Sequence, residues 1–328
     1  MLYSQADIIK HHRTQRGLTQ GQLAEGICSR FHIVKAEAGT RKLSAFAMNE
    51  VLMKLGLNPQ DFNWGIDIED NAMIFFAQKE REMKANVANW DREGLMKIKA
   101  DIDNFHETLE SSEQFRELLM LTIDMHLNLP QADNIRNPNL PKPDIAKARA
   151  YATQAIEINR PKFDLEKIDT YYLTLREYAL INTVATTYGY LDDLPKEVEI
   201  LAKLKASYDK NQKALIQNYG DRQLYFGIIT NIAINCKLLG MWEDCLEQAT
   251  ENMDTFLKHN DISLYARALY QRAYSLMKLE RLEEGKSYYN KFFMLAYILD
   301  GHAAINFDIV KKEYEDVFGG QMEIKAEW

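Results

Sequence analysis

The chain has 328 residues, with 40 Lys and Arg against 48 Asp and Glu and a hydrophobic fraction of 46%. This length favours two structural units over one, and the composition is that of an ordered globular protein, which argues against extensive disorder. Seven Pro and 15 Gly are too few for the frequent turns of an all-β sandwich or barrel. An all-α fold is therefore expected.

The sequence also indicates the compartment. It has no run of about 18 apolar residues, and its first residues lack the apolar core and cleavage site of a signal peptide. Cys28, Cys236 and Cys245 are odd in number and widely spaced, which fits neither a disulfide framework nor a zinc knuckle. We therefore expect a cytoplasmic protein with reduced thiols and no membrane contact.

Charge is distributed unevenly along the chain. Residues 1–65 hold eight basic and five acidic side chains, a net charge of +3, so the remainder carries about −11. A small basic head on a large acidic body suggests that only the head approaches a polyanion.

The head begins with two predicted helices. The first starts at Asp7 and stops at Gly17, a residue typical of a helix end. Thr19 is placed to cap a second, short helix, and Gln22 completes a capping box with it.

A third helix is predicted from Ser29 to Gly39. Ile33 and Ala36 give it an inward face, to which either Phe31 or His32 could belong. Ser44 is placed to cap a fourth helix, and Pro59 opens a short fifth. Five short helices with a tight turn between the second and third predict a helix-turn-helix domain over residues 1–66.

The head also carries a family resemblance. The runs Arg16–Gln20, Leu23–Ala24 and Gly26–Ser29, with Glu37 and Gly39, resemble the Cro/repressor (XRE-type) DNA-binding domain, and the Ile-Cys-Ser turn is similar to that of PlcR/Rgg-type regulators. Val34 and Ala36 replace the Ser and Ile, respectively, that are usual in that family. The resemblance implies an internal ion pair or hydrogen bond for Glu37.

Groove chemistry identifies the candidate DNA contacts. The first turn of a recognition helix reaches base edges, whereas a helix start and loop cations reach phosphates. The candidate base readers are Ser29, Arg30 and His32, with Lys35 reaching a base or a phosphate. The candidate phosphate contacts are Thr19, Gln20, Arg41 and Lys42.

Residues 67–328 read as a succession of long amphipathic helices, which we expect to form a superhelical array. A proline-rich irregular loop is predicted at 129–143. The predicted helices span 72–88, 91–109, 112–128, 144–158, 166–190, 195–218, 221–239, 242–258, 262–279, 282–299 and 302–318.

Residues 231–245 and 271–285 align without gaps at a period of 40. Ala233 and Ala273 supply the small residue of a tetratricopeptide-like (TPR-like) pattern, although Glu280 replaces the glycine of the first copy, Gly240. We therefore expect divergent repeats of helix pairs, whose concave surface suits an extended peptide or a partner helix.

Two sets of polar residues are candidate peptide contacts. Asn231 and Asn235 flank the predicted buried seam of their helix, Gln271 aligns with Asn231, and amide side chains can pair with an extended backbone. The second set is a polar stripe on the otherwise apolar 166–190 segment, comprising Tyr172, Arg176, Thr183 and Thr187. Arg176 could bind a peptide carboxylate, or it could pair with an acidic residue of a neighbouring helix.

No catalytic motif of the common classes is present, so neither an enzyme nor a cofactor is expected. An XRE-type head on a TPR-like body resembles the peptide-responsive regulators of Gram-positive bacteria. The resemblance implies a homodimer on a palindromic operator, controlled by a short signalling peptide bound in the body. The alternatives are a DNA-tethered scaffold that binds a protein partner and, with no supporting site, a phosphatase-like body.

Overall fold

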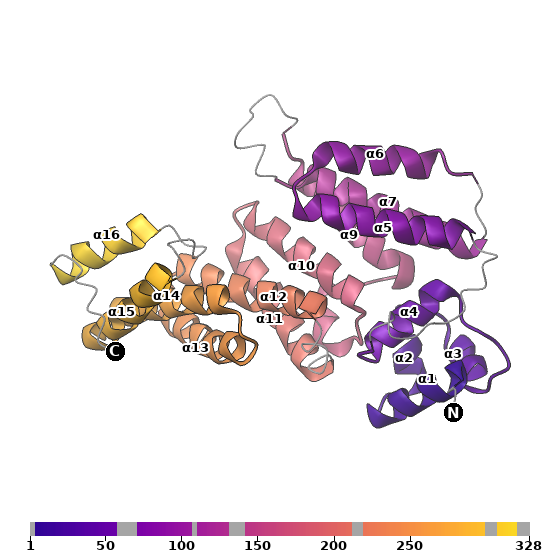
Figure 1. Cartoon of the computed structure of the whole chain (residues 1–328), viewed down its shortest axis with the longest axis horizontal. Helices are drawn as coiled ribbons and strands as arrows, with labels where there is room; N and C mark the ends of the chain where they lie inside the picture. Colours follow the sequence, from indigo (N-terminus) through magenta and orange to yellow (C-terminus); the bar gives the residue numbers. More distant parts are fainter. Residues whose placement is uncertain are drawn as a thin grey trace. The chain divides into compact units, whose positions relative to one another are not determined.

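The structure is a computed structural model that describes residues 4–57, 71–106, 110–130, 142–211, 219–298 and 307–319. Every regular element in these ranges is a helix, so the all-α prediction is confirmed (Figure 1). The chain divides into two compact units, Met1–Arg222 and Gln223–Trp328. The predicted domain boundary after residue 66 lies outside the described residues. No helix in the described ranges is long and apolar enough to span a membrane.

The structure describes four helices in the head. Thr19 and Ser44 cap two of them, as predicted, and Ser4 caps the first helix in the same way. The Ser4, Thr19 and Ser44 hydroxyl oxygens each accept a backbone N–H of the following first turn. The predicted fifth helix at Pro59 lies outside the described residues. The helices are α1 (Gln5–Gln15), α2 (Gln20–Ala24), α3 (Arg30–Glu37) and α4 (Ala45–Lys54).

The head has a hydrophobic core of its own. Ile9 of α1, Leu23 of α2, Ile33 of α3 and Leu52 of α4 are completely buried in it. Helix α3 packs against both α1 and α2. The turn before α3 contains Gly26 at φ +73°, a left-handed backbone that favours glycine. The predicted helix-turn-helix arrangement is thus present in α2 and α3.

The rest of the first unit consists of antiparallel helices that pack mainly on their neighbours in sequence. Helix α5 packs on α6 and α7, α7 on α9, α9 on α10, and α10 on α11. Phe76 and Ile123 are completely buried in a second hydrophobic core, formed by the first three helices. The elements are α5 (Asn71–Ala88), α6 (Arg92–Asp103), α7 (Glu110–Asn128), α9 (Ile145–Asn159), the 3₁₀ helix η2 (Leu165–Thr170), α10 (Leu175–Gly189) and α11 (Leu194–Asn211).

The single helix predicted over 166–190 is wrong. The structure has η2 and α10 in its place, separated by an extended segment at 171–174. The Thr174 hydroxyl oxygen accepts the Glu177 N–H at 3.2 Å, and the Glu177 carboxylate accepts the Thr174 N–H at 2.7 Å. This reciprocal capping box starts a new helix, and it places Tyr172 in the extended segment, apart from the helical stripe.

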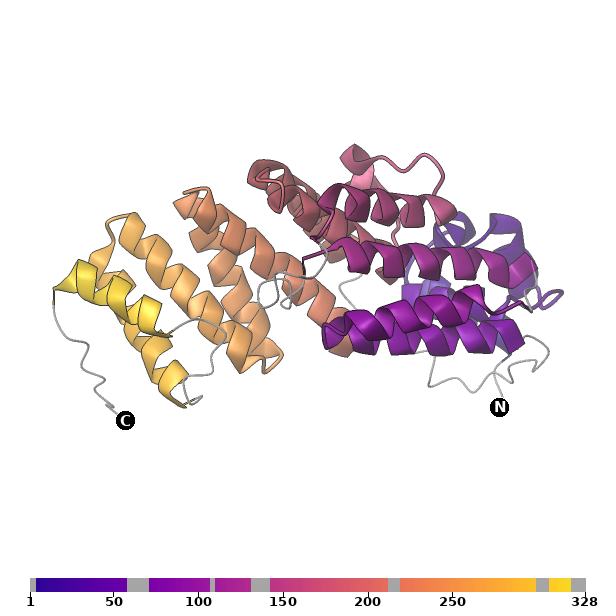
Figure 2. The ribbon, with the colours of Figure 1, turned by 90° about the horizontal axis from the view of Figure 1, so that it is seen from above.

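The second unit contains α13 to α16 and almost all of α12. Helices α13, α14 and α15 lie side by side, as both views show (Figures 1 and 2). The helices are α12 (Tyr219–Leu238), α13 (Trp242–Lys258), α14 (Ile262–Lys278), α15 (Leu282–Ile298) and α16 (Phe307–Phe318).

The period of 40 corresponds to a repeated packing contact. In the first copy the Cys245 thiol donates to the Ala233 carbonyl at 3.3 Å, where α13 crosses α12. At the aligned position of the second copy, a Cβ on Gly285 would lie 3.2 Å from the Ala273 carbonyl oxygen. Small residues at both crossings let the paired helices approach closely, so the two helix pairs are structural repeats.

Most other predicted boundaries agree with the structure to within two residues. The exception is the predicted 91–109 helix, which ends at Asp103, and the helix ends predicted at 218 and 302 lie outside the described residues. Residues 107–109, 131–141, 212–218, 299–306 and 320–328 lie outside the described ranges, and with them most of the predicted irregular loop.

Candidate functional site

The start of the third helix is the most exposed part of the helix-turn-helix. Ser29 and Arg30 are exposed, and the Ser29 side chain makes no capping hydrogen bond. Arg30 lines an open cleft of about 560 Å³ together with Thr19, Gln20 and Gly21 at the start of α2 and Arg13 of α1. Arg30 therefore lies beside the start of α2, with Ser29 next to it in the chain.

A partly buried ion pair holds α3 in this position. The Arg13 Nε donates to Glu37 Oε1 at 2.5 Å, and the Gln20 amide donates to Glu37 Oε2 at 2.9 Å. Burial by itself would raise the pKa of Glu37, but the hydrogen bonds from Arg13 and Gln20 lower it below its ordinary value. The internal pairing expected of Glu37 is confirmed, and Gln20, a candidate phosphate contact, is part of it.

The structure settles which side chains of α3 face inward. Ile33 and Ala36 are buried, His32 is half-buried and Phe31 is 58% exposed, so Phe31 does not belong to the inward face. The Lys35 ammonium lies 4.4 Å from the centre of the Phe31 ring. An exposed aromatic ring thus lies beside the polar residues of α3. Phe31 and His32 are adjacent, and no signal in the sequence distinguished between them.

The remaining candidate phosphate contacts flank this helix. Thr19 is exposed at the start of α2, and its hydroxyl oxygen accepts the Gln22 N–H at 3.1 Å, which leaves its O–H able to donate. Arg41 and Lys42 are exposed in the segment that joins α3 to α4. The structure therefore brings Thr19, Gln20 and Arg30 to one cleft and carries the two loop cations just beyond α3.

The candidate peptide contacts of the second unit lie around a shallow pocket of about 200 Å³. Gln271 of α14 and Ile234 and Leu238 of α12 line it, as do Lys237, Arg267 and Tyr270. Asn231 precedes Ile234 by three residues and Asn235 by four on α12, so it shares a helix face with each of them, although neither asparagine lines the pocket itself.

Asn235 and Gln271 are buried more deeply than the sequence indicates, at 5% and 3% exposure. The Asn235 Nδ2 is nevertheless a buried donor with no hydrogen-bond partner in the structure. Such a group is costly unless something accepts from it. Asn231 is half-buried one turn earlier. These amides are therefore suited to meet an acceptor that approaches this face of α12.

A hydrogen-bonded chain begins at two of the residues that line the pocket. The Lys237 ammonium donates to the Tyr270 hydroxyl at 2.5 Å, and that hydroxyl donates to Glu313 Oε2 of α16 at 2.8 Å. Burial, followed by the hydrogen bond to Glu313, raises the pKa of Tyr270. The three groups connect α12, α14 and α16 across the second unit.

The side chains of the polar stripe on α10 already have partners within the first unit. The Arg176 Nη2 lies 3.1 Å from Glu50 Oε1 of α4 and 3.0 Å from Glu80 Oε1 of α5. The Thr183 and Thr187 hydroxyls donate to backbone carbonyls of their own helix. Arg176 is thus in the internal pairing that the sequence left as one of two alternatives, and its charge is compensated by two carboxylates.

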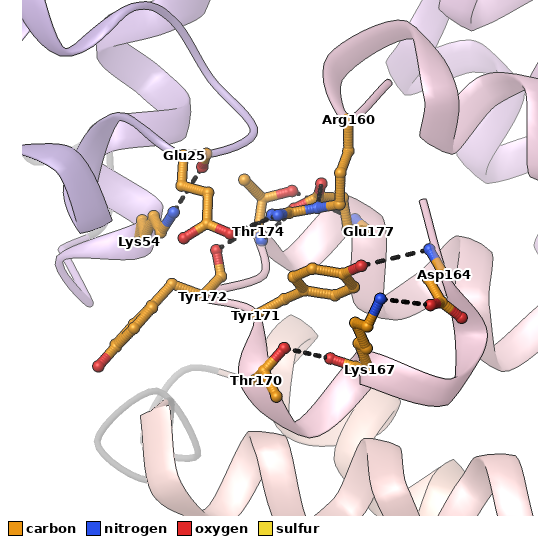
Figure 3. A network of polar contacts seen from close by, with 10 residues as sticks. All are labelled: Glu25, Lys54, Arg160, Asp164, Lys167, Thr170, Tyr171, Tyr172, Thr174 and Glu177. Carbon is orange, nitrogen blue, oxygen red and sulfur yellow. Dashed lines mark hydrogen bonds and ion pairs between the residues drawn. The ribbon is translucent and has the colours of Figure 1, made fainter. Parts of the chain in front are cut away.

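A second arginine joins the head to the rest of the first unit. The Arg160 Nε donates to Glu177 Oε1 of α10 at 2.9 Å, and its Nη1 forms an ion pair with Glu25 at the end of α2 (Figure 3). Arg160 is only 8% exposed. The Lys54 ammonium donates to the Glu25 carbonyl at 2.6 Å, and burial lowers the pKa of Lys54 to about 8. No sequence signal pointed to this cluster, because its members are far apart in the chain.

Within the described residues, no group of three or more His, Cys, Asp or Glu side chains could hold a metal ion. No model of a known protein family and no curated protein sequence matches the chain.

Two solved structures are similar in fold. Bacillus thuringiensis PlcR, in complex with the peptide PapR7 and DNA, has a TM-score of 0.45 and 19% identity, with 92% of this chain and 97% of that chain covered. A candidate transcriptional regulator from Listeria monocytogenes EGD-e has a TM-score of 0.45 and 17% identity, with 98% of this chain and 100% of that chain covered.

Proposed function

We propose that the protein is a transcription regulator that binds operator DNA through its head and is controlled by a short peptide bound in its helical body. The observation that carries the first part is the exposed start of α3 beside the start of α2, held in place by the partly buried Arg13–Glu37 pair. A protruding helix start with an arginine and a serine fits the major groove.

Each candidate residue has a role in this proposal. Arg30 reads a guanine through its two-pronged guanidinium, and Ser29 and His32 read neighbouring base edges. Phe31 lies against a thymine methyl group, while Thr19, Gln20, Lys35, Arg41 and Lys42 contact phosphates. The chain acts as a homodimer on a palindromic site, because one helix-turn-helix covers only a half-site.

The proposed peptide site is the α12–α14 face. The unpaired Asn235 donor supports it, since a carbonyl of an extended peptide would supply the missing acceptor. Asn231 and Gln271 extend the row of amides, and Ile234 and Leu238 supply apolar contact at the pocket. Arg176 and Thr183 are not included, because their polar groups already have partners within the first unit.

A random heptapeptide display library panned on the full chain tests the peptide site, and a selected synthetic peptide is then titrated by calorimetry. Asn231→Ala combined with Asn235→Ala is expected to weaken its binding about tenfold or more, since each lost hydrogen bond costs roughly 0.5 to 1.5 kcal/mol. Thermal stability is expected to stay nearly unchanged, because the Asn235 donor has no partner to lose.

The matched control is Asn290→Ala, which removes an exposed amide from α15. It is expected to leave binding unaltered. Unchanged affinity in the double variant would place the peptide elsewhere, and a large loss of stability would make the two asparagines part of the core. Recovery of folded proteins but no peptides from a parallel lysate screen would favour the DNA-tethered scaffold.

A further inference from the structure

We infer that Arg160 is a positioning residue for operator recognition: it fixes the orientation of the DNA-binding head by joining Glu25 of the head to Glu177 of α10. This inference rests on the proposed DNA-binding function. It concerns a residue of the body that contacts no DNA in that proposal and lies outside the recognition helix.

Both carboxylate-bearing partners of Arg160 are themselves held by further hydrogen bonds. On the body side, Glu177 also accepts the Thr174 N–H, so the carboxylate that holds Arg160 is fixed by the first turn of α10. On the head side, Lys54 of α4 holds the Glu25 backbone. The Tyr171 ring lies under the Arg160 guanidinium, with 4.5 Å from its centre to Cζ (Figure 3). The arginine therefore has little freedom to reorient.

The backbone of the helix-turn-helix itself comes close to this site. A Cβ added at Gly26 would lie 2.8 Å from both carboxylate oxygens of Glu177. Gly26 lies two residues after the end of α2 and four residues before the start of α3. A contact here thus sets the direction of α3 more directly than a contact on an outer helix of the head would.

Arg176, which precedes Glu177 on α10, forms a second contact between the body and the head. Arg176 pairs with the buried Glu50 of α4, and its guanidinium lies over the Phe46 ring at 5.1 Å. Burial raises the pKa of Glu50, although Arg176 acts to lower it. Adjacent residues of one helical turn therefore anchor two different helices of the head, α2 through Arg160 and α4 directly.

The head keeps its own hydrophobic core, so these polar contacts, together with the Phe46–Phe115 ring contact, set its orientation without being needed for its fold. Loss of one partner of a buried ion pair leaves the other charge uncompensated, which strongly disfavours the docked arrangement. Water can solvate the separated charges, so a head without Arg160 is expected to stay folded and to lose its fixed orientation.

A fixed head orientation has a measurable consequence for a dimer. Adding one base pair between half-sites moves one of them by about 3.4 Å and rotates it by roughly 34° about the DNA axis. Two rigidly held heads can match only one spacing, whereas two loosely held heads tolerate several. Arg160 should therefore determine selectivity for spacer length and leave base preference within each half-site unchanged.

The test measures fluorescence anisotropy of the full chain on a selected operator and on versions with one base pair added or removed at the centre. The original chain is expected to discriminate between spacings by about tenfold or more, and Arg160→Ala by less than about threefold. Glu25→Gln, which removes the head-side charge and keeps the carbonyl bound by Lys54, is expected to give the same relaxation. Arg160→Lys should restore part of the selectivity.

Arg149→Ala is the matched control, because Arg149 lies on α9, the helix that Arg160 ends, and its guanidinium stacks on the Tyr188 ring of α10 at 3.9 Å. It is expected to keep the original spacing profile. An unchanged profile in both Arg160→Ala and Glu25→Gln would overturn the inference, as would an equal relaxation in Arg149→Ala. If the original chain selects no operator at all, the proposed function itself fails.

Discussion

Arg30 and Lys42 are both exposed cations of the head, but they lie on different elements. Arg30 is in the first turn of α3, where a side chain can reach base edges, whereas Lys42 follows the helix. We predict that Arg30→Ala costs about 1 to 3 kcal/mol at particular base pairs and relaxes preference there, while Lys42→Ala weakens binding to all sequences alike. Selection of duplexes by each variant measures both effects.

Two outcomes of this selection would contradict the roles given to Arg30 and Lys42. A consensus that Arg30→Ala leaves unchanged would mean that α3 enters the groove in a register different from the one proposed. A consensus altered by Lys42→Ala would move the reading surface to the segment after α3.

At the scale of single residues, the sequence predicted those hydrogen bonds whose two residues lie close together in the chain. In the capping box, Thr19 and Gln22 are three positions apart, and it was predicted from that spacing. The partners of Arg160 and Arg176 lie 135 and 96 residues away in the chain, at Glu25 and Glu80. Periodicity along one helix indicates that a polar side chain on a buried face needs a partner. It does not indicate which residue of another helix is that partner.

At the scale of elements, helix ends in this chain share one geometry. Among the described turns after residue 71, five that join consecutive α-helices place a residue in the left-handed region, four of them without glycine. Each is closed by a backbone hydrogen bond across six residues, such as Arg281 N to Leu276 O at 2.9 Å. The turns have this conformation at Trp90, Asp192, Gly240, Asn260 and Glu280.

Glu280 stands where the first repeat has Gly240, with φ of +60° against +72°. A non-glycine residue is strained at this φ, so Glu280→Gly is expected to raise the free energy of unfolding by roughly 0.5 to 1 kcal/mol. Glu280→Ala is the matched control, because it removes the same carboxylate and retains the strain. Thermal denaturation of the full chain measures both, and equal stabilities of the two variants would contradict this account.

The one wrong element, the helix over 166–190, shows why hydrophobic pattern alone misleads. Leu173 and Leu175 are both buried, so an apolar pattern continues across the extended segment. Thr174 and Glu177 have the spacing of a capping box, and that local signal marks the true start of α10. The apolar periodicity and the capping box indicated different helix starts, and the capping box indicated the one that the structure has.

At the scale of the whole molecule, the sequence predicted a helix-turn-helix followed by repeated helix pairs, and the all-α fold is confirmed. The side on which each helix is buried was harder to predict, as the near-complete burial of Asn235 and Gln271 shows. Packing against neighbouring helices decides their exposure, and the sequence of a single helix does not carry that information. If a peptide binds here and alters operator affinity, thermodynamic linkage requires the operator to alter peptide affinity by the same factor.

The central claim is that the chain reads DNA through α3 as a dimer. Selection of the full-length protein on a pool of randomised duplexes, followed by sequencing of the bound fraction, tests it most directly. The account predicts enrichment of an inverted repeat whose half-site centres lie about one helical turn, roughly 10 base pairs, or a multiple of it apart. A bound fraction with no sequence enrichment, or with a single unrepeated half-site, would contradict it.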